Sequence, residues 1–320
     1  MREASNKVRA PVLIKVLGAG AGGGFPQWNC NGPLSRAAWD RSPAVAARTQ
    51  ASLAVSVDGE RWALLNASPD IRQQIIATPA LQPRRDGSLR NSPIRAAVLT
   101  GADVDQVAGL LTLRERQAFT IYASRRVLDT LAANSIFNVL APDCVDRLEL
   151  PLGEAQWLTD HGQDLGLYVR PFTAPGKIAL YLEDKAAGAG LGTRDGDTIG
   201  LEVGDRSGKR FYYLPTCASL SADLETRLEG APLIFVDGTL FYDDELIRQG
   251  LLDKTGQRMG HISMGGPQGS LAVFASLKVA RRVYIHINNS NPVLDRRSPE
   301  HRQVVEAGWE IAFDGMEIEL

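Results

Sequence analysis

The chain has 320 residues, of which 35 are basic and 37 are acidic, so its formal net charge at pH 7 is −2. This balance gives no electrostatic reason to expect nucleic acid or an anionic membrane as a partner, and no apolar run approaches the ~20 residues that span a bilayer. The cysteines Cys30, Cys144 and Cys217 lie far apart, which argues against a disulfide framework and favours a reducing compartment. Residues 1–10 are too polar for a signal peptide and are predicted to be a disordered extension. We expect a cytoplasmic protein whose residues 11–320 form one domain.

Apolar runs bounded by turn residues predict the strands of this chain. In the first half they cover residues 12–17, 52–57, 61–65, 94–99 and 119–122. In the second half they cover residues 165–173, 178–182, 198–203, 210–214, 233–236, 283–287, 309–313 and 316–320. Helices are predicted over residues 107–113, 127–133, 221–228, 270–277 and 299–307. A further helix is expected after Ser68 as its N-cap, and a glycine-rich surface loop over residues 186–197.

The order of these elements predicts the fold class. Each half begins with paired strands and continues with helix–strand units. Such an order is typical of two mixed sheets that pack face to face with helices on the outside. We therefore expect an α/β protein built as an αββα sandwich.

A glycine-rich segment, GAGAGGGFPQWNC, follows the first predicted strand. Gly18 and Gly20 begin like a dinucleotide-binding fingerprint, but Phe25, Pro26 and Trp28 stand where the helix of that motif should start. The segment is better interpreted as a loop whose glycines let the backbone pass close to another segment.

Two carboxylates, Asp103 and Asp105, lie in the turn between the strand 94–99 and the helix 107–113. Loops at strand ends carry much of the chemistry of layered α/β proteins, and two acids in this spacing can approach one cation or one water from the same side. The alternative is that one acid caps the helix and the other is solvated.

Many segments of the chain together resemble the PqqB family of pyrroloquinoline quinone (PQQ) biosynthesis, a branch of the metallo-β-lactamase fold. They are GAGAGGGFPQWNC, RTQASLAVS, LLNASPDIRQQI, DVDQVAGLLTLRE, FVDGT, DKTGQRMGHISM, IHINNSNPVLD and FDGMEIEL. The resemblance implies a metallo-β-lactamase-like domain and a cytoplasmic role in making the quinone, with the precursor peptide or an intermediate, and other PQQ-biosynthesis proteins, as partners. Two roles are proposed for the family: Fe(II)-dependent hydroxylation of a tyrosine, or carriage of the quinone towards the periplasm. A degenerate paralogue acting as a scaffold is a third possibility for this chain.

The resemblance also implies a set of metal ligands. The His-x-His-x-Asp-His signature of the fold falls on Gly101, Asp103, Asp105 and Gln106, whereas the family usually keeps the last histidine. His286 matches the late metal-site histidine of the family, so Asp103, Asp105 and His286 form a carboxylate-rich set for Fe(II) that is short by one imidazole.

Two further side chains could join that set. Asp237 matches the bridging acid of the wider fold, or it is only the hydrogen-bond partner of a loop amide. His261 lies in a glycine-flanked loop and either serves the metal or braces the loop. The alternative for His286 is that its imidazole is not a metal ligand but lies in the core with its hydrogen bonds satisfied there.

The first loop departs from the family a second time. At this place the family carries the pattern Asn-Cys-x-Cys-x-x-Cys, a thiolate cluster that holds structural zinc. This chain has Cys30, Gly32 and Ser35 at the three cysteine positions. We expect no structural zinc, a buried Cys30, and a loop held instead by Trp28 and Trp39.

Overall fold

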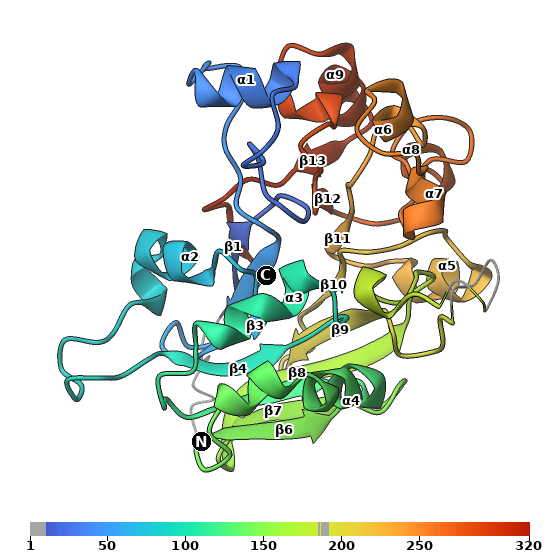
Figure 1. Ribbon diagram of the computed structural model, residues 1–320. Coiled ribbons are helices and arrows are strands. Elements are labelled where there is room, and N and C mark those ends of the chain that lie inside the picture. Colours follow the sequence, from blue (N-terminus) through green and yellow to red (C-terminus); the bar gives the residue numbers. More distant parts are fainter. Residues whose placement is uncertain (1–10, 185, 187–191) are drawn as a thin grey trace, which may run out of the picture.

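The computed structural model describes residues 11–184, 186 and 192–320. The expected extension 1–10 and part of the expected loop 186–197 lie outside these residues. Two seven-stranded mixed sheets pack face to face, with helices on the outer sides (Figure 1). The αββα sandwich predicted from the order of elements is thereby confirmed.

The first sheet comes from both ends and the first half of the chain. Its strands, in spatial order, are β14 (Glu317–Glu319), β1 (Leu13–Gly18), β2 (Ser52–Ser56), β3 (Trp62–Leu65), β4 (Ile94–Val98), β5 (Phe119–Ala123) and β6 (Val145–Glu149). Strands β3 to β6 are parallel, whereas β14, β1, β2 and β3 pair in antiparallel fashion.

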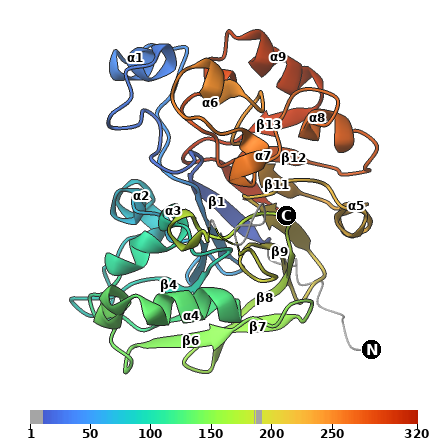
Figure 2. The same cartoon turned by 45° about the vertical axis from the view of Figure 1, so that its right-hand side comes forward.

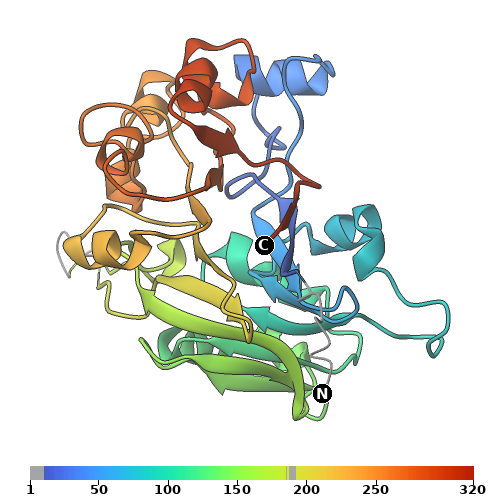
Figure 3. The same cartoon turned by 180° about the vertical axis from the view of Figure 1, so that it is seen from behind.

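The second sheet repeats this plan with the later strands. They are β13 (Trp309–Ile311), β12 (Arg282–Ile285), β11 (Ile234–Asp237), β10 (Arg210–Leu214), β9 (Ile199–Asp205), β8 (Gln163–Thr173) and β7 (Gln156–Asp160). Strands β10 to β13 are parallel and β7 to β10 antiparallel. Figure 3, seen from behind, shows the long strand β8 crossing this sheet. The carboxyl ends of parallel strands meet at one edge of a sheet, so each sheet offers one edge where strand-end loops gather.

Three apolar layers hold the sandwich together. Side chains from both sheets, among them Leu53, Tyr122, Phe211 and Phe235, form the layer between the sheets. A second layer packs the first sheet against α2 (Ile71–Ala77), α3 (Val104–Val107) and α4 (Arg125–Ala133). A third packs the second sheet against α1 (Pro33–Trp39), α5 (Ala222–Leu228), α8 (Ser270–Val273) and α9 (Pro299–Glu306). Figure 2 shows α1 at the same end of the molecule as α9 and the short helices α6 (Glu245–Arg248) and α7 (Gly256–Met259).

Three local predictions were wrong. The strand expected over 178–182 is a 3-10 turn, Leu180–Leu182, because its backbone N–H groups bond to side chains and to its own turn rather than to a neighbouring strand. Ser68 does not cap α2, because its hydroxyl bonds to the Gln74 side chain and Asp70 takes the N-cap position. The helix expected over 107–113 starts at Val104 and tightens into a 3-10 turn after Val107, where Gly109 N donates to a carbonyl outside the helix.

The glycine-rich segment that begins at the last residue of β1 passes close to other segments, as predicted. A Cβ on Gly18 would lie 2.2 Å from the carbonyl oxygen of Gln50, which leaves room only for glycine. Gly20 forms bridges to Gln50 on one side and to Ile287 on the other. The loop therefore links the ends of the two sheets beside the candidate site.

No helix among the described residues is both long enough and apolar enough to cross a bilayer.

Candidate functional site

The predicted site residues come from separate loops at the strand ends of both sheets. Asp103 and Asp105 follow β4 of the first sheet. Asp237 ends β11 and His286 directly follows β12, both in the second sheet. His261 lies in the loop after α7. The packing of the two sheets thus brings together side chains that are up to 183 positions apart, the separation of Asp103 and His286.

Asp105 and His286 make the contact that joins the two halves of the site. The Nε2 atom of His286 lies 2.9 Å from Oδ2 of Asp105, and both side chains are largely buried. Burial alone would raise the pKa of Asp105, but the hydrogen bond and charge of His286 outweigh it and lower that pKa. Burial opposes the charged form of His286 as well, yet the same bond and charge raise its pKa. Both shifts favour the charged forms of the two groups.

The backbone of His286 is held in an unusual conformation. Its φ is +60°, in the left-handed region that residues with a side chain seldom adopt. Neighbouring Ile287 exchanges backbone hydrogen bonds with Ala19 and Ala21 of the glycine-rich loop. These bonds hold the turn that directs the imidazole towards Asp105, and backbone strain of this kind clusters at functional sites.

Asp237 is a fully buried hydrogen-bond acceptor. Its Oδ2 accepts from the Cys217 backbone N at 2.8 Å and faces Nδ1 of His261 at 2.7 Å. Its Oδ1 accepts from the Thr239 backbone N at 3.0 Å and from the Thr239 hydroxyl at 2.7 Å. Because an ionised carboxylate can only accept, Nδ1 of His261 carries the proton and Nε2 of that ring keeps its lone pair.

Thr239 contacts Asp237 and both imidazoles, a role that the sequence did not reveal. Its Oγ1 lies 2.9 Å from Nδ1 of His286 and 3.1 Å from Nδ1 of His261, besides donating to Asp237. One hydroxyl thereby orients both imidazoles. The only sequence signal was its position in Asp-Gly-Thr at a strand end.

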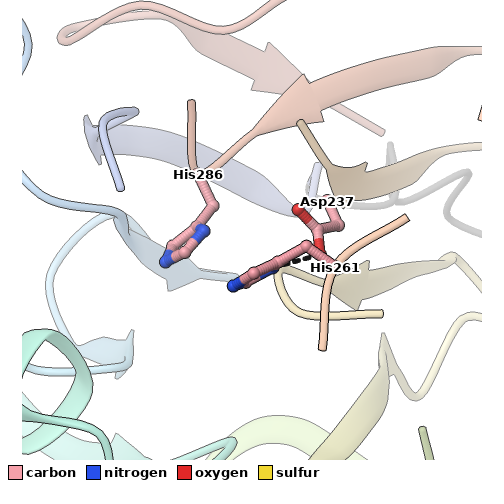
Figure 4. Close-up of side chains that lie close together, drawn as sticks. All are labelled: Asp237, His261 and His286. Atoms are coloured by element: carbon pink, nitrogen blue, oxygen red, sulfur yellow. Dashed lines mark hydrogen bonds and ion pairs between the residues drawn. The ribbon is translucent and has the colours of Figure 1, made fainter. Parts of the chain in front are cut away.

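Asp237, His261 and His286 form a group that could hold a metal ion, since one ligand atom from each lies within 4.8 Å of the others. The two imidazole rings stack with centroids 5.4 Å apart and planes 24° from parallel. Figure 4 shows both rings with one nitrogen pointing the same way, away from Asp237.

Asp103 lies beside this group and contacts other partners. Its Oδ1 is 3.4 Å from the Leu180 backbone N, and its side chain makes no capping bond to α3 although it occupies the N-cap position. Burial, together with the charge of Asp105, raises its pKa to about 6. The alternative of one capping and one solvated acid is therefore wrong: Asp105 is paired with His286, and neither acid caps the helix.

Gln106, which replaces the family histidine, is buried at 3 % exposure. Its Oε1 has no hydrogen-bond partner among the described residues, and its Nε2 lies 3.5 Å from the Thr216 hydroxyl. A Cβ on Gly101 would lie 2.4 Å from that Oε1, so the glycine makes room for the amide.

A cavity of about 530 Å³ opens over these side chains. Asp103, Asp105, Gln106, His261 and His286 line it, and Asp237 is not among the described residues that do so. Apolar side chains form another part of the wall, and two lysines that sequence reasoning missed, Lys177 and Lys254, complete it.

The first loop differs from the prediction in how it is held. Cys30 is half-buried rather than buried, because it lines the cavity instead of packing in the core. Trp28 is 83 % exposed and packs little, whereas Trp39 donates its indole N–H to the Cys30 carbonyl. Gly32 N also bonds to the Cys30 sulfur, and Ser35 is buried in α1.

Comparisons with known proteins agree with this architecture. A family model described as "Beta-lactamase superfamily domain" matches residues 61–287. "Coenzyme PQQ synthesis protein B" of Xanthomonas campestris pv. campestris (strain B100) is 52 % identical over 307 residues, covering 96 % of this chain and 99 % of the relative. The protein of the same name from Gluconacetobacter diazotrophicus is 52 % identical over 95 % of this chain and 98 % of its own length.

Solved structures give the same result. Zn(2+)-bound PqqB from Methylobacterium extorquens is 46 % identical, with a TM-score of 0.89 over 96 % of this chain and 100 % of that one. A diphosphatase from the PhnP family, 19 % identical with a TM-score of 0.66 over 97 % of both chains, shares the fold alone. The chain therefore belongs to the PqqB family of coenzyme PQQ synthesis proteins, within the β-lactamase superfamily.

Proposed function

We propose that this protein takes part in the synthesis of PQQ as a metal-dependent enzyme that hydroxylates a tyrosine-derived aromatic intermediate. The observation that carries the proposal is the convergence of two imidazoles and a carboxylate on one cavity. His261, His286 and Asp105 all line that cavity, and a two-histidine, one-carboxylate set is the donor group of non-haem Fe(II) oxygenases. Metal binding by a relative, the Zn(2+)-bound PqqB, supports a metal here as well.

The donor atoms fit a divalent cation. Asp237 keeps the proton of His261 on Nδ1, so Nε2 is available as a ligand. Nε2 of His286 and Oδ2 of Asp105 lie 2.9 Å apart in a hydrogen bond, and a cation would compete with the proton of that bond for both atoms. Asp237 itself is fully buried and its oxygens already accept four hydrogen bonds, so we assign it to positioning His261 and not to ligation.

When bound, Fe(II) supplies the redox chemistry by which dioxygen places one oxygen atom on an aromatic ring. The overall change converts an aromatic C–H to C–OH, and it consumes one dioxygen, two electrons from an external reductant and two protons, with water as the other product. The residues of this chain orient the ligands and exclude bulk water. Asp103 is placed on the cavity wall where it can exchange a proton with the ring hydroxyl or a bound water.

Carriage without catalysis is the second candidate, and Gln106 is the observation that favours it. An amide is a poorer ligand for a transition metal than the imidazole it replaces. Gln106 lines the cavity, so an amide stands at the wall where the family has an imidazole, and its buried Oε1 has no hydrogen-bond partner among the described residues.

Metal loading tests the enzyme proposal. Purified protein incubated anaerobically with Fe(II) should bind close to one ion per chain, and His286→Gln and Asp105→Asn should each weaken binding by more than tenfold. His301→Gln is the matched control, because that imidazole lies in α9 and bonds to the Val293 carbonyl outside the site. Sub-stoichiometric iron in the unaltered protein would exclude the hydroxylase.

Function is tested in a host that makes PQQ and lacks its own protein of this family. The unaltered chain should restore PQQ production, and the His286→Gln variant should not. Restoration by both, together with saturable PQQ binding by metal-free protein, would favour the carrier. If neither chain restores PQQ production, the result would favour the scaffold role.

A further inference from the structure

A carboxylate outside the cavity holds the segment with which the His286 turn is paired. Asp314 lies in residues 312–316, the connection by which the chain leaves β13, at the edge of the second sheet, and enters β14, at the edge of the first. Figure 3 shows this connection in dark red, running from β13 to the end marked C. Asp314 is not among the described residues that line the cavity, so its effect on the site must pass through other residues.

Asp314 binds two segments at once. Its Oδ1 accepts from the Ala19 backbone N at 3.1 Å, and its Oδ2 accepts from the Thr49 backbone N at 2.7 Å and lies 2.8 Å from the Thr49 hydroxyl. Burial raises the pKa of Asp314, whereas these hydrogen bonds and the charge of Arg48 oppose the rise. Ala19 is fully buried, and its backbone N has no other acceptor among the described residues. Removal of the carboxylate would therefore leave a buried N–H group unpaired.

The residues that Asp314 holds lead directly to the His286 turn. Ile287 donates its backbone N–H to the Ala19 carbonyl at 2.9 Å, and Ala21 donates its own to the Ile287 carbonyl at 2.9 Å. Ile287 directly follows His286 in the chain. Asp314 thus fixes the segment that supplies both backbone partners of the residue next to the imidazole.

The strained backbone of His286 makes this support necessary. A residue with a side chain persists in the left-handed region only where the surrounding structure over-determines its conformation, and the φ of His286 is +60°. Within the described residues, the backbone N–H and carbonyl of Ile287 bond to the glycine-rich segment alone. If that pairing opened, the backbone of His286 could relax, and its imidazole would no longer be directed towards Asp105.

We infer that Asp314 is a positioning residue for His286, which it holds through the pairing of Ala19 and Ala21 with Ile287. The inference rests on the proposed function where it concerns metal affinity, because His286 is then a ligand. It deepens that function by naming a residue outside the cavity that sets the geometry of the metal site. The pairing itself can be tested in the metal-free protein.

Two substitutions in the full-length protein, Asp314→Ala and Asp314→Asn, test the inference. Alanine removes both acceptor oxygens and asparagine removes one, so the alanine variant should show the larger effect. In metal-free protein, amide hydrogen exchange of Ile287, measured by NMR relative to that of Ile121 in β5, should accelerate by about tenfold in Asp314→Ala, because the pairing opens without global unfolding. Anaerobic Fe(II) titration should show binding weakened by about tenfold in Asp314→Ala and by about threefold in Asp314→Asn.

Met316→Ala is the matched control. Met316 lies two residues further along the same connection and packs in the layer between the sheets, so its truncation should lower the urea midpoint, as Asp314→Ala should. Its backbone carbonyl keeps the bond from Val16 N. Met316→Ala should therefore leave the relative exchange of Ile287 and the Fe(II) affinity unchanged, whereas a merely structural role of Asp314 predicts the same effects for both variants.

Unchanged relative exchange of Ile287 in both Asp314 variants would overturn the inference, and so would equal weakening of Fe(II) binding by Met316→Ala and Asp314→Ala. Asp314 would then only brace the connection between the sheets. The two proposals fail separately. If the unaltered chain binds no Fe(II), the hydroxylase is refuted, while the exchange of Ile287 still decides the role of Asp314. If the unaltered chain binds Fe(II) and both Asp314 variants bind it equally well, the positioning role alone is refuted.

Discussion

Asp237→Asn is the change that most directly separates positioning from ligation. The substitution keeps the size of the side chain but leaves one acceptor oxygen where Asp237 offers two. If the remaining oxygen stays with Thr239, the new amide NH₂ faces the Cys217 backbone N, which lies 2.8 Å from Oδ2 in the native protein. Two donors then face each other, and a buried N–H without an acceptor costs about 1–3 kcal/mol of unfolding free energy.

The same substitution alters the tautomer of His261. The amide NH₂ donates where the carboxylate accepted, so Nδ1 of His261 must accept and its proton moves to Nε2. Nε2 then offers no lone pair to a cation, and we expect Fe(II) affinity to fall about 10–100-fold, as for other partners that orient a metal-binding histidine.

Urea unfolding of the metal-free variant, followed by tryptophan fluorescence, measures the first effect, and anaerobic Fe(II) titration measures the second. Asp86→Asn is the control, because Asp86 is exposed and its ion-pair partner among the described residues is the surface residue Arg84, so it should change neither quantity. A stability loss without any change in Fe(II) affinity would show that Asp237 braces the loop and does not set the state of His261. No change in either quantity would refute the reasoning altogether.

Three further changes test the site and the scaffold around it. Gln106→His should raise Fe(II) affinity, because the side chain at this position lines the cavity and an imidazole replaces an amide; an unchanged dissociation constant would count against a metal at this place. Gly18→Ala should lower the unfolding free energy by about 1–3 kcal/mol, since its Cβ would lie 2.2 Å from the Gln50 carbonyl oxygen; an unchanged urea midpoint would mean that the loop moves freely. Asn291→Ala should lower the unfolding free energy by about 1–3 kcal/mol, because the buried Val293 N–H loses its acceptor. A midpoint temperature of thermal unfolding equal to that of the unaltered protein would contradict this.

The sequence predicts the layers of this fold well because they depend on apolar periodicity. Strands such as β4 and β5 are runs of buried residues that end at turn residues. Strand β6, with the sequence VDRLE, lies at the edge of its sheet and has a single buried residue. Its sequence therefore has no apolar pattern from which the strand could be predicted. Helix α1 was missed for the same reason, because only Ser35 of its seven residues is buried.

Only the site residues that lie at strand ends could be predicted from the sequence. Asp105, Asp237 and His286 each lie at or just after the end of an apolar run. That position drew attention to them, and the resemblance to the PqqB family assigned Asp237 and His286 to the metal site. The role of Thr239 could not be predicted, because a hydroxyl between two imidazoles depends on loops from different parts of the chain meeting in space. Lys177 and Lys254 were missed for a related reason: a lysine in a loop is usually solvated, and only the tertiary structure shows which one borders a cavity.

The distribution of hydrogen bonds shows how the side chains of the site are oriented within each half of the fold. Asp237, Thr239 and His261 all belong to the second-sheet half and fix one another. Asp105 comes from the first-sheet half, and its pairing with the strained His286 joins the two halves. A cation held by Asp105 and His286 would compete for this contact and would join the same two halves. Because Thr239 and Asp237 already orient the two imidazoles through their Nδ1 atoms, the hydrogen bonds of the second-sheet half reduce the cost of organising these ligands.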